Sequence, residues 1–206
     1  MADISQNAQQ AYQLLVQMGY QPHQAAGIVG NLIQESGPSM SPTITGDKGR
    51  AFGVAQWRDS RRQDLHRYAA KGGMDPNSLE TQIKFLDNEL RTTERGTLDA
   101  INRSSTPQEA ASAFLGFERP LGYSQRNPQL SSGYDNRVAN AADVYAMYKD
   151  QASNRFTTSP PDQAGFMGKA QPSSDFYGQA QPQQTTGALT VNPITGDPLY
   201  PYSFGS

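Results

Sequence analysis

Apolar residues in the first 150 positions recur at helical spacing in separate blocks, and each block ends at a glycine, a proline or a polar cap. The first block ends at Gly19 and predicts a helix of about 14 residues. The second begins at Pro22, because proline is well tolerated in the first helical turn, and stops at residues 36–38. Its apolar stripe consists of Ala25, Ala26, Val29, Leu32 and Ile33.

Start and stop signals predict five more helices after residue 58. They are a third helix capped by Asp59 or Ser60, a fourth opened by a capping box of Asn77 and Glu80, a short fifth around Leu98 and Ile101, a sixth opened by Thr106, Pro107 and Glu109 and stopped by Pro120, and a seventh from about Asp135 to Lys149. Residues 38–57 mix glycines with β-branched residues and predict a short β-hairpin or an ordered loop. The expected fold class is mainly α, a helical domain with a small β or loop lobe.

The composition changes sharply at residue 150. Charged residues number 31 in the first 150 positions and 5 in the last 56, and the last 56 also hold seven of the 14 prolines, six glycines and seven glutamines. Such a segment buries too little apolar surface to offset its ordering entropy. We therefore predict a folded domain over residues 1–150 and an extended or disordered Pro/Gly/Gln-rich tail over residues 151–206. Its scattered aromatic residues leave two interpretations open, a docking segment for another protein and a solvated linker.

Charge and composition exclude several classes of function. With 17 basic and 19 acidic residues the formal net charge is −2, which removes the broad positive field used in nucleic-acid binding. The chain has no cysteine, and its two histidines, His23 and His66, cannot form a three-histidine zinc site, so neither metal nor cofactor is expected. Residues 1–10 do not resemble an export signal, and no run approaches the roughly 18 apolar residues of a membrane helix. We expect no nucleic-acid partner and no membrane insertion.

Glu35 stands out because it lies in the last turn of an apolar helix, where free carbonyl groups place partial negative charge beside it. Both this dipole and partial desolvation disfavour the charged form, so the pKa of Glu35 is predicted to rise toward that of a general acid. Glycosidic cleavage requires such a proton donor. The alternative is a solvated glutamate at a helix end capped by Ser36.

Two later segments carry further candidate groups. Residues 53–57 begin 18 residues after Glu35 and end in Gln56 and Trp57, an amide and an indole that suit hydrogen bonding and stacking with a sugar. The alternative for Trp57 is a place in the core. At residues 117–120 Glu118 offers another carboxylate at a helix end, and the alternative there is an ion pair with the adjacent Arg119 that fixes a turn.

These three motifs, taken in order and spacing, resemble the phage tail lysozyme family of the lysozyme-like superfamily across roughly residues 10–148. The helix-terminal Glu-Ser followed by a Gly-x-x-Gln segment is also similar to lytic transglycosylases and goose-type lysozymes. The resemblance implies an α-rich lysozyme-like fold, peptidoglycan as substrate, and cleavage of the β-1,4 bond between N-acetylmuramic acid and N-acetylglucosamine. It also implies a tail-associated protein of a phage virion that acts at the host cell wall or periplasm, and it says nothing about residues 151–206.

Carried over residue by residue, the resemblance implies that Glu35 is the catalytic acid. It places Ser36, Gln56, Trp57 and Glu118 on the substrate-binding side of the cleft. A second catalytic carboxylate is sought in the turn-like residues 45–49, where Asp47 lies 12 residues past Glu35 and could orient a water molecule. The alternatives are that Asp47 is an ordinary turn residue, and that Asp59, which helix capping already explains, faces the cleft.

If neither aspartate faces the cleft, Glu35 acts alone, as in lytic transglycosylases, where the 6-hydroxyl of the sugar attacks. Hydrolase and transglycosylase therefore both stay open. So do a non-catalytic structural virion protein with a glycan-binding lysozyme-like domain, and a glycosidase directed at chitin. The joint presence of Glu35, Gln56 and Trp57 favours the enzyme. The expected partners are peptidoglycan strands and, through residues 151–206, other virion proteins.

Overall fold

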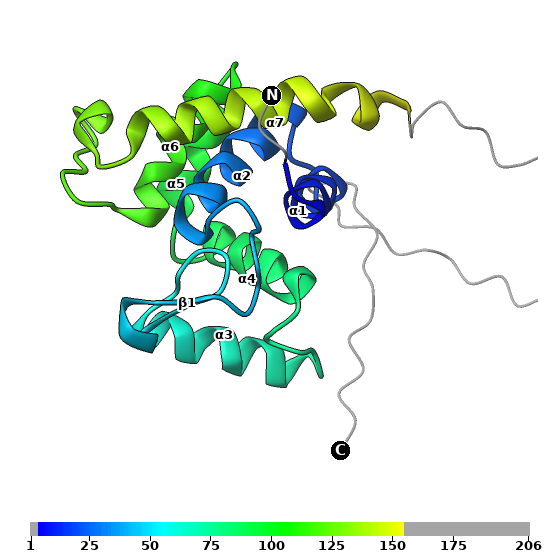
Figure 1. Cartoon of the computed structure of the whole chain (residues 1–206), viewed down its shortest axis with the longest axis vertical. Helices are drawn as coiled ribbons and strands as arrows, with labels where there is room; N and C mark the ends of the chain where they lie inside the picture. The colour runs from blue at the N-terminus through cyan, green and yellow to red at the C-terminus, as the bar shows by residue number, and fades with distance from the viewer. Residues whose placement is uncertain (1–3, 155–206) are drawn as a thin grey trace, which may run out of the picture. The chain divides into compact units, whose positions relative to one another are not determined.

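The computed structural model describes residues 4–154, with side chains described for residues 4–150. Within that range seven α-helices surround a very small antiparallel sheet (Figure 1), which confirms the predicted mainly α fold with a small β lobe. The predicted tail lies almost wholly outside the described residues. The elements are α1 (Gln6–Gln17), α2 (Pro22–Ser36), β1 (Thr45–Gly46), η1 (Asp47–Gly49), β2 (Ala51–Phe52), α3 (Asp59–Lys71), α4 (Leu79–Arg91), α5 (Arg95–Asn102), α6 (Pro107–Glu118), η2 (Pro128–Leu130) and α7 (Tyr134–Asn154).

The helix starts test the predicted caps. At α6 the prediction is confirmed, because Thr106 Oγ1 accepts a hydrogen bond from the Glu109 amide. At α3 it is wrong: Arg58 is the N-cap residue, no side chain caps the helix, and Asp59 is its first residue. At α4 the cap is Ser78 and not Asn77, because Asn77 belongs to the preceding turn, where its backbone amide donates to Asp75 Oδ1 at 2.9 Å.

Helix α2 is the centre of the helical part and packs against α1, α6 and α7. Two glycines on α2 allow its close contacts with neighbouring helices. A Cβ at Gly30 would lie 2.5 Å from the backbone nitrogen of Ala141 in α7, and one at Gly27 would collide with Ala110 in α6. This packing leaves the C-terminal end of α2, which carries Glu35, facing the β lobe (Figure 1).

The β lobe over residues 38–57 is anchored to the helical part in part through Gln82, a buried side chain of α4. Thr45 pairs with Phe52 and Gly46 with Ala51, and Phe52 also forms a bridge with Trp57. From α4, Gln82 accepts a hydrogen bond from the Val54 amide at 2.9 Å and donates to the Pro42 carbonyl at 2.7 Å. The predicted hairpin or ordered loop is thus a minimal hairpin fixed to α4.

Candidate active site

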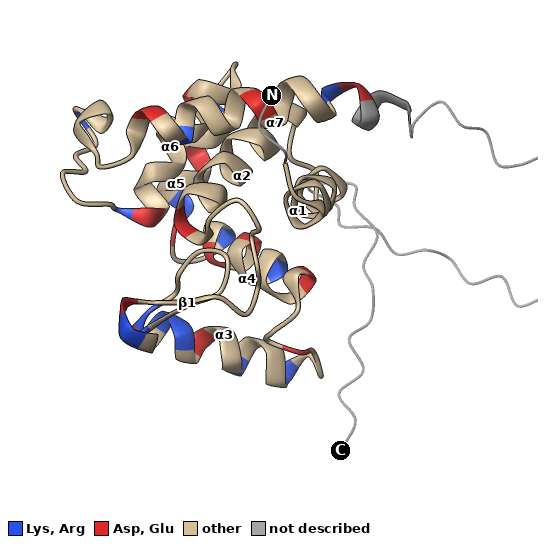
Figure 2. Ribbon diagram, in the orientation of Figure 1, with Lys and Arg blue, Asp and Glu red and all other residues tan. Residues whose placement is uncertain are grey.

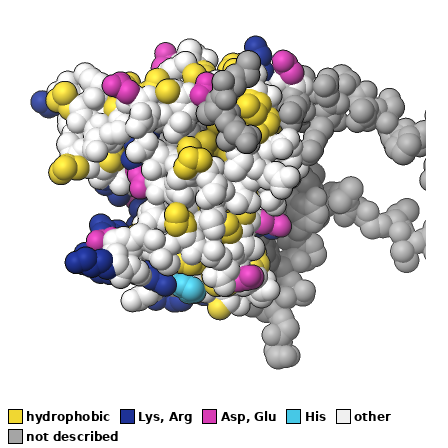
Figure 3. Space-filling view, in the orientation of Figure 1, with side chains coloured by type: hydrophobic (Ala, Val, Ile, Leu, Met, Phe, Trp, Pro, Cys, Tyr) yellow, Lys and Arg dark blue, Asp and Glu magenta, His cyan; other side chains and the backbone are white. Residues whose placement is uncertain are grey.

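A cavity of about 710 Å³ opens between the end of α2 and the β lobe. Figure 3 shows a notch on the side of the molecule where the β lobe meets the helical part, with acidic and basic side chains at it. Basic residues are concentrated along the β lobe and the start of α3 (Figure 2). The charged residues that line the cavity are Glu35, Asp47, Arg58, Asp59, Arg61, Glu118, Arg119 and Arg137.

Glu35 lies in the last turn of α2, with 23% of its side chain exposed. Its Oε1 accepts a hydrogen bond from Arg137 Nη2 of α7 at 2.5 Å. Arg137 Nη1 also donates to Asn31 Oδ1 at 3.1 Å, and the Asn31 amide donates to the carbonyls of Gly27 and Ala111. This buried chain of hydrogen bonds joins α2, α6 and α7 and fixes the position of the Glu35 carboxylate. The role of Glu35 as catalytic acid stays a prediction.

Arg137 is a site residue that the sequence did not reveal. It is 3% exposed, although nothing near it in the predicted seventh helix distinguishes it from a surface arginine. One indirect signal existed: Asn31 lies within the apolar stretch of α2 and is fully buried. A buried amide needs hydrogen-bond partners, so Asn31 indicated that another polar group reaches this helix.

Glu118 is the last residue of α6 and lines the same cavity as Glu35. The residue is half-buried, and its Oε1 is buried without a hydrogen-bond partner. Burial in the first place, and then the charge of Glu35, raise the pKa of Glu118 well above its usual value; Arg61 and Arg137 act in the opposite direction. Desolvation, one of the two effects expected to favour a general acid at Glu35, therefore acts most clearly at Glu118.

The suggested ion pair between Glu118 and its neighbour Arg119 is wrong. Arg119 ends α6 in a left-handed conformation, with φ 49°, and its guanidinium pairs with Glu94 at 2.6 Å. This turn directs the two adjacent side chains to different partners. Glu118 remains at the cavity without a counter-ion from its own segment.

Both candidate aspartates line the cavity with Glu35. Asp47 Oδ2 pairs with Arg50 at 2.7 Å and also with Arg58, and 30% of the Asp47 side chain is exposed. Asp59 lines the same cavity at the start of α3. The turn around residue 47 thus presents a carboxylate held by two guanidinium groups, and its catalytic role stays a prediction.

Of the three remaining predicted contacts with substrate, only Gln56 lines the cavity, where its Nε2 donates to the Gly53 carbonyl at 2.8 Å. Ser36 is 1% exposed and donates its hydroxyl back to the Leu32 carbonyl at 2.7 Å. Trp57 is also 1% exposed, and its ring packs against Phe85. The predictions that Ser36 and Trp57 contact substrate are wrong. The Ser36 hydroxyl is bonded within its own helix, and the Trp57 indole belongs to the core.

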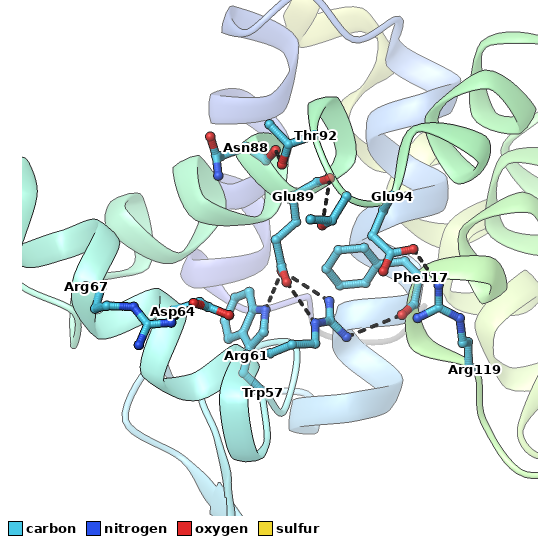
Figure 4. Close-up of polar contacts among 11 residues, drawn as sticks. Trp57, Arg61, Asp64, Arg67, Asn88, Glu89, Thr92, Glu94, Phe117 and Arg119 are labelled. Carbon is cyan, nitrogen blue, oxygen red and sulfur yellow. Dashed lines mark hydrogen bonds and ion pairs between the residues drawn. The ribbon is translucent and has the colours of Figure 1, made fainter.

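A second group of charges lies beside the cavity, and we call Trp57, Arg61 and Glu89 the Glu89 cluster (Figure 4). Trp57 Nε1 donates to Glu89 Oε2 at 2.7 Å, and Arg61 donates to both Glu89 oxygens, at 2.8 and 3.1 Å. The Arg61 guanidinium also lies 4.3 Å from the ring centre of Phe117 in α6. The cluster joins the β lobe to α3, α4 and α6 and so supports the wall of the cavity.

Backbone strain is concentrated at the cavity. Four lining residues have left-handed conformations that non-glycine residues rarely adopt: Asp47, Gln56 and Asp59, each with φ 47°, and Arg119, with φ 49°. Such a conformation costs of order 1–3 kcal/mol and persists where the surrounding structure enforces it. Among the described residues, two other non-glycine positions, Met40 and Lys48, are left-handed and do not line this cavity.

The described residues also bear on metal binding and on membrane insertion. Within residues 4–154, no group of three or more His, Asp or Glu side chains is placed to hold a metal ion. In the same part of the chain no helix is both long and apolar enough to cross a membrane.

A comparison with protein families identifies the family of this chain. The model of a family described as phage tail lysozyme matches residues 6–148, which is more than half of the chain and includes every element from α1 to the greater part of α7. No curated protein matches the sequence. The resemblance carried by the three sequence motifs is confirmed, and it supports a lysozyme-like function on peptidoglycan.

Proposed function

Because the chain belongs to the phage tail lysozyme family, we propose that it cleaves the β-1,4 bond between N-acetylmuramic acid and N-acetylglucosamine in peptidoglycan. One observation carries this proposal: of the four carboxyl groups that line the cavity, Glu35 and Glu118 have contrasting environments. One is hydrogen-bonded to a guanidinium, and the other has a buried oxygen without a partner. Glycosidases use such a pair, in which one carboxyl is protonated and the other ionised.

The cavity wall supplies the other parts of this proposal. Gln56 offers an amide to sugar hydroxyl or acetamido groups, since it lines the cavity from the β lobe. Asp47, on the same lobe, is available to orient an attacking water molecule. The mixed charges of the lining suit a polar polymer better than an apolar ligand.

The reaction has two possible products, which differ in the attacking oxygen. Attack by water leaves a reducing end, whereas attack by the 6-hydroxyl of the sugar leaves a 1,6-anhydro end. Mass spectrometry of digested peptidoglycan distinguishes them directly. With chitin as a parallel substrate, the same measurement tests whether the glycan must contain N-acetylmuramic acid.

Glu35→Gln tests the proposal, because the substitution removes the carboxylate and keeps the size of the side chain. We expect loss of clearing of purified cell walls with the circular dichroism spectrum unchanged. Glu80→Gln is the matched control, since Glu80 lies on α4 with 54% of its side chain exposed and does not line the cavity. If Glu35→Gln clears cell walls at nearly the wild-type rate, Glu35 does not take part in the cleavage. Wild-type protein that binds walls without releasing fragments would support a structural glycan-binding role instead.

The proposal extends to the location of the protein. A member of this family that cuts glycan strands would be carried in the phage tail and act at the host cell wall or periplasm. Residues 151–206 would attach it to other virion proteins. Residues 155–206 lie outside the described part of the chain, so this attachment rests on composition alone.

A further inference from the structure

The cavity needs an apolar surface other than Trp57 if it is to contact the apolar face of a sugar. The sequence predicts Trp57 for this role, but its indole is buried in the core. Among the described residues, four other apolar ones line the cavity: Ala51, Ala55, Pro120 and Leu121. Both alanines are buried, so neither offers a surface of useful size. The apolar surface of the cavity is therefore provided by Pro120 and Leu121, which follow the end of α6.

Leu121 is the most exposed large hydrophobic side chain of the described residues. It is 88% exposed, and two others, Leu130 and Met147, are also exposed, at 70% and 37%. A single exposed leucine is ordinary on a protein surface. Leu121 differs from the other two because it lines the cavity, three residues after Glu118 and in the same wall.

The backbone holds Leu121 in a fixed position on the connection between α6 and α7 (Figure 1). The Tyr123 amide donates to the Pro120 carbonyl at 2.9 Å and closes a turn, and the Ser132 amide donates to the Leu121 carbonyl at 2.8 Å. Gly122 allows the two segments to approach, because its φ is 80° and a Cβ there would lie 2.7 Å from the facing backbone. A side chain presented from a fixed turn loses little conformational freedom when a ligand covers it.

We propose that Leu121, together with Pro120, is the apolar contact for one sugar ring of the glycan strand in the cavity. This rests on the proposed function and names a residue that positions its substrate. One face of a pyranose ring exposes mainly C–H groups, whereas hydroxyl and acetamido groups surround the ring. The C–H face lies on Leu121, and the polar groups meet the polar lining, which includes Gln56. Burial of the exposed leucine contributes to the affinity for the glycan.

The surroundings of Leu121 favour a glycan over a protein as the molecule that covers it. The centre of a protein interface is usually apolar and depleted of charge, with a polar rim. Here the arrangement is the reverse, because Leu121 stands at a cavity whose other exposed lining is charged or carries amide and hydroxyl groups. A polymer of sugars offers both an apolar ring face and many hydrogen-bonding groups, and so matches both parts of this surface.

Leu121→Ser tests the contact, with Leu130→Ser as the matched control on the same connection. Both leucines are exposed, so neither substitution should change the free energy of unfolding in urea. In calorimetric titration with a tetrasaccharide of alternating N-acetylglucosamine and N-acetylmuramic acid, Leu121→Ser should bind about 10-fold more weakly, the loss expected when roughly two CH₂ groups are no longer buried. On cell walls its KM should rise with kcat nearly unchanged, because the contact is made before and during the reaction. Leu130→Ser should match the wild type in both assays.

Leu121→Met keeps an apolar side chain and should bind the tetrasaccharide as the wild type does. Equal affinity of Leu121→Ser and the wild type overturns the proposal. So do an equal loss in Leu130→Ser and a wild type that binds no tetrasaccharide. A protein that shows the expected binding but cuts no cell walls refutes the proposed function and leaves the contact standing. If the wild type and Leu121→Ser cut walls with the same KM, the contact is refuted and the proposed function stands.

Discussion

Two glutamates beside the same arginine have opposite environments in this protein: Glu89 is buried, and Glu118 is half-buried. Glu89 accepts hydrogen bonds on both oxygens, from Arg61 and from Trp57. Glu118 has a buried oxygen that accepts none, although the charge of Arg61 acts on it. Burial alone therefore does not set the state of a carboxyl, because the two differ in their hydrogen-bond partners. The bonds of Glu89 join three parts of the fold, whereas the Glu118 carboxyl faces the cavity with one oxygen unpaired.

The largest expected contrast comes from the same substitution at these two positions. Glu118→Gln should slow the release of cell-wall fragments by roughly 10²–10⁴-fold, the usual contribution of a carboxyl group that takes part in general acid–base catalysis, with little change in stability. Glu89→Gln should lower the free energy of unfolding by about 2–3 kcal/mol. That loss is below the usual value for a broken buried ion pair, because 30% of the Arg61 side chain is exposed. Urea unfolding and the clearing of cell walls, each measured on both variants, check these two predictions.

The loss of activity in Glu118→Gln and the loss of stability in Glu89→Gln must be measured separately. Activity should be assayed where Glu89→Gln remains folded, so that lost clearing reports chemistry and not unfolding. A Glu118→Gln protein that is as destabilised as Glu89→Gln, and that clears walls normally once folded, would remove the distinction between the two glutamates.

Trp57→Phe tests whether the Trp57 indole stabilises the core or binds the sugar. The substitution keeps an aromatic ring but removes the hydrogen bond from Nε1 to Glu89. We expect unfolding to be easier by about 1–3 kcal/mol, the cost of leaving a buried charged acceptor short of a donor. The KM for glycan should not change, because the indole is 1% exposed. A raised KM at unchanged stability would instead show that Trp57 contacts the substrate.

The smallest effect is a pH dependence of stability. Because the pKa of Glu118 is raised in the folded state, the folded protein holds this proton to a higher pH than the unfolded chain does. The associated stability is fully present below the unfolded pKa, near 4.3, and is lost as the pH rises through the folded pKa. The unfolding free energy of the wild type, minus that of Glu118→Gln, should fall by at most about 1.4 kcal/mol per pH unit in this window. A difference that rises with pH would contradict the raised pKa.

The helices were predictable because the sequence of each contains a start signal, an apolar stripe and a stop signal. Pro22 and the Ser36-Gly37 end bound α2 as expected, and Thr106 caps α6. The caps of α3 and α4 were misplaced because short polar residues also favour turns. Asn77 bonds into the turn before α4 and leaves the cap to Ser78.

The candidate site was predictable only where its signal is local. Glu35 and Gln56 were found from their own segments, and both line the cavity. Arg137 lies 102 residues from Glu35, and their hydrogen bond exists only because α7 packs along α2. The indole was misassigned for the same reason, since its partner Glu89 comes from another helix. No local pattern states whether a carboxyl such as Glu118 will find a partner.

The left-handed backbone at Asp47, Gln56, Asp59 and Arg119 has a consequence for engineering heat tolerance. Glycine adopts this conformation without the penalty of roughly 1–2 kcal/mol borne by other residues. Glycine at these four positions would therefore relieve backbone strain and could raise the melting temperature. All four residues line the cavity where the glycan is proposed to bind, so we expect such a gain in stability to lower the rate of cleavage.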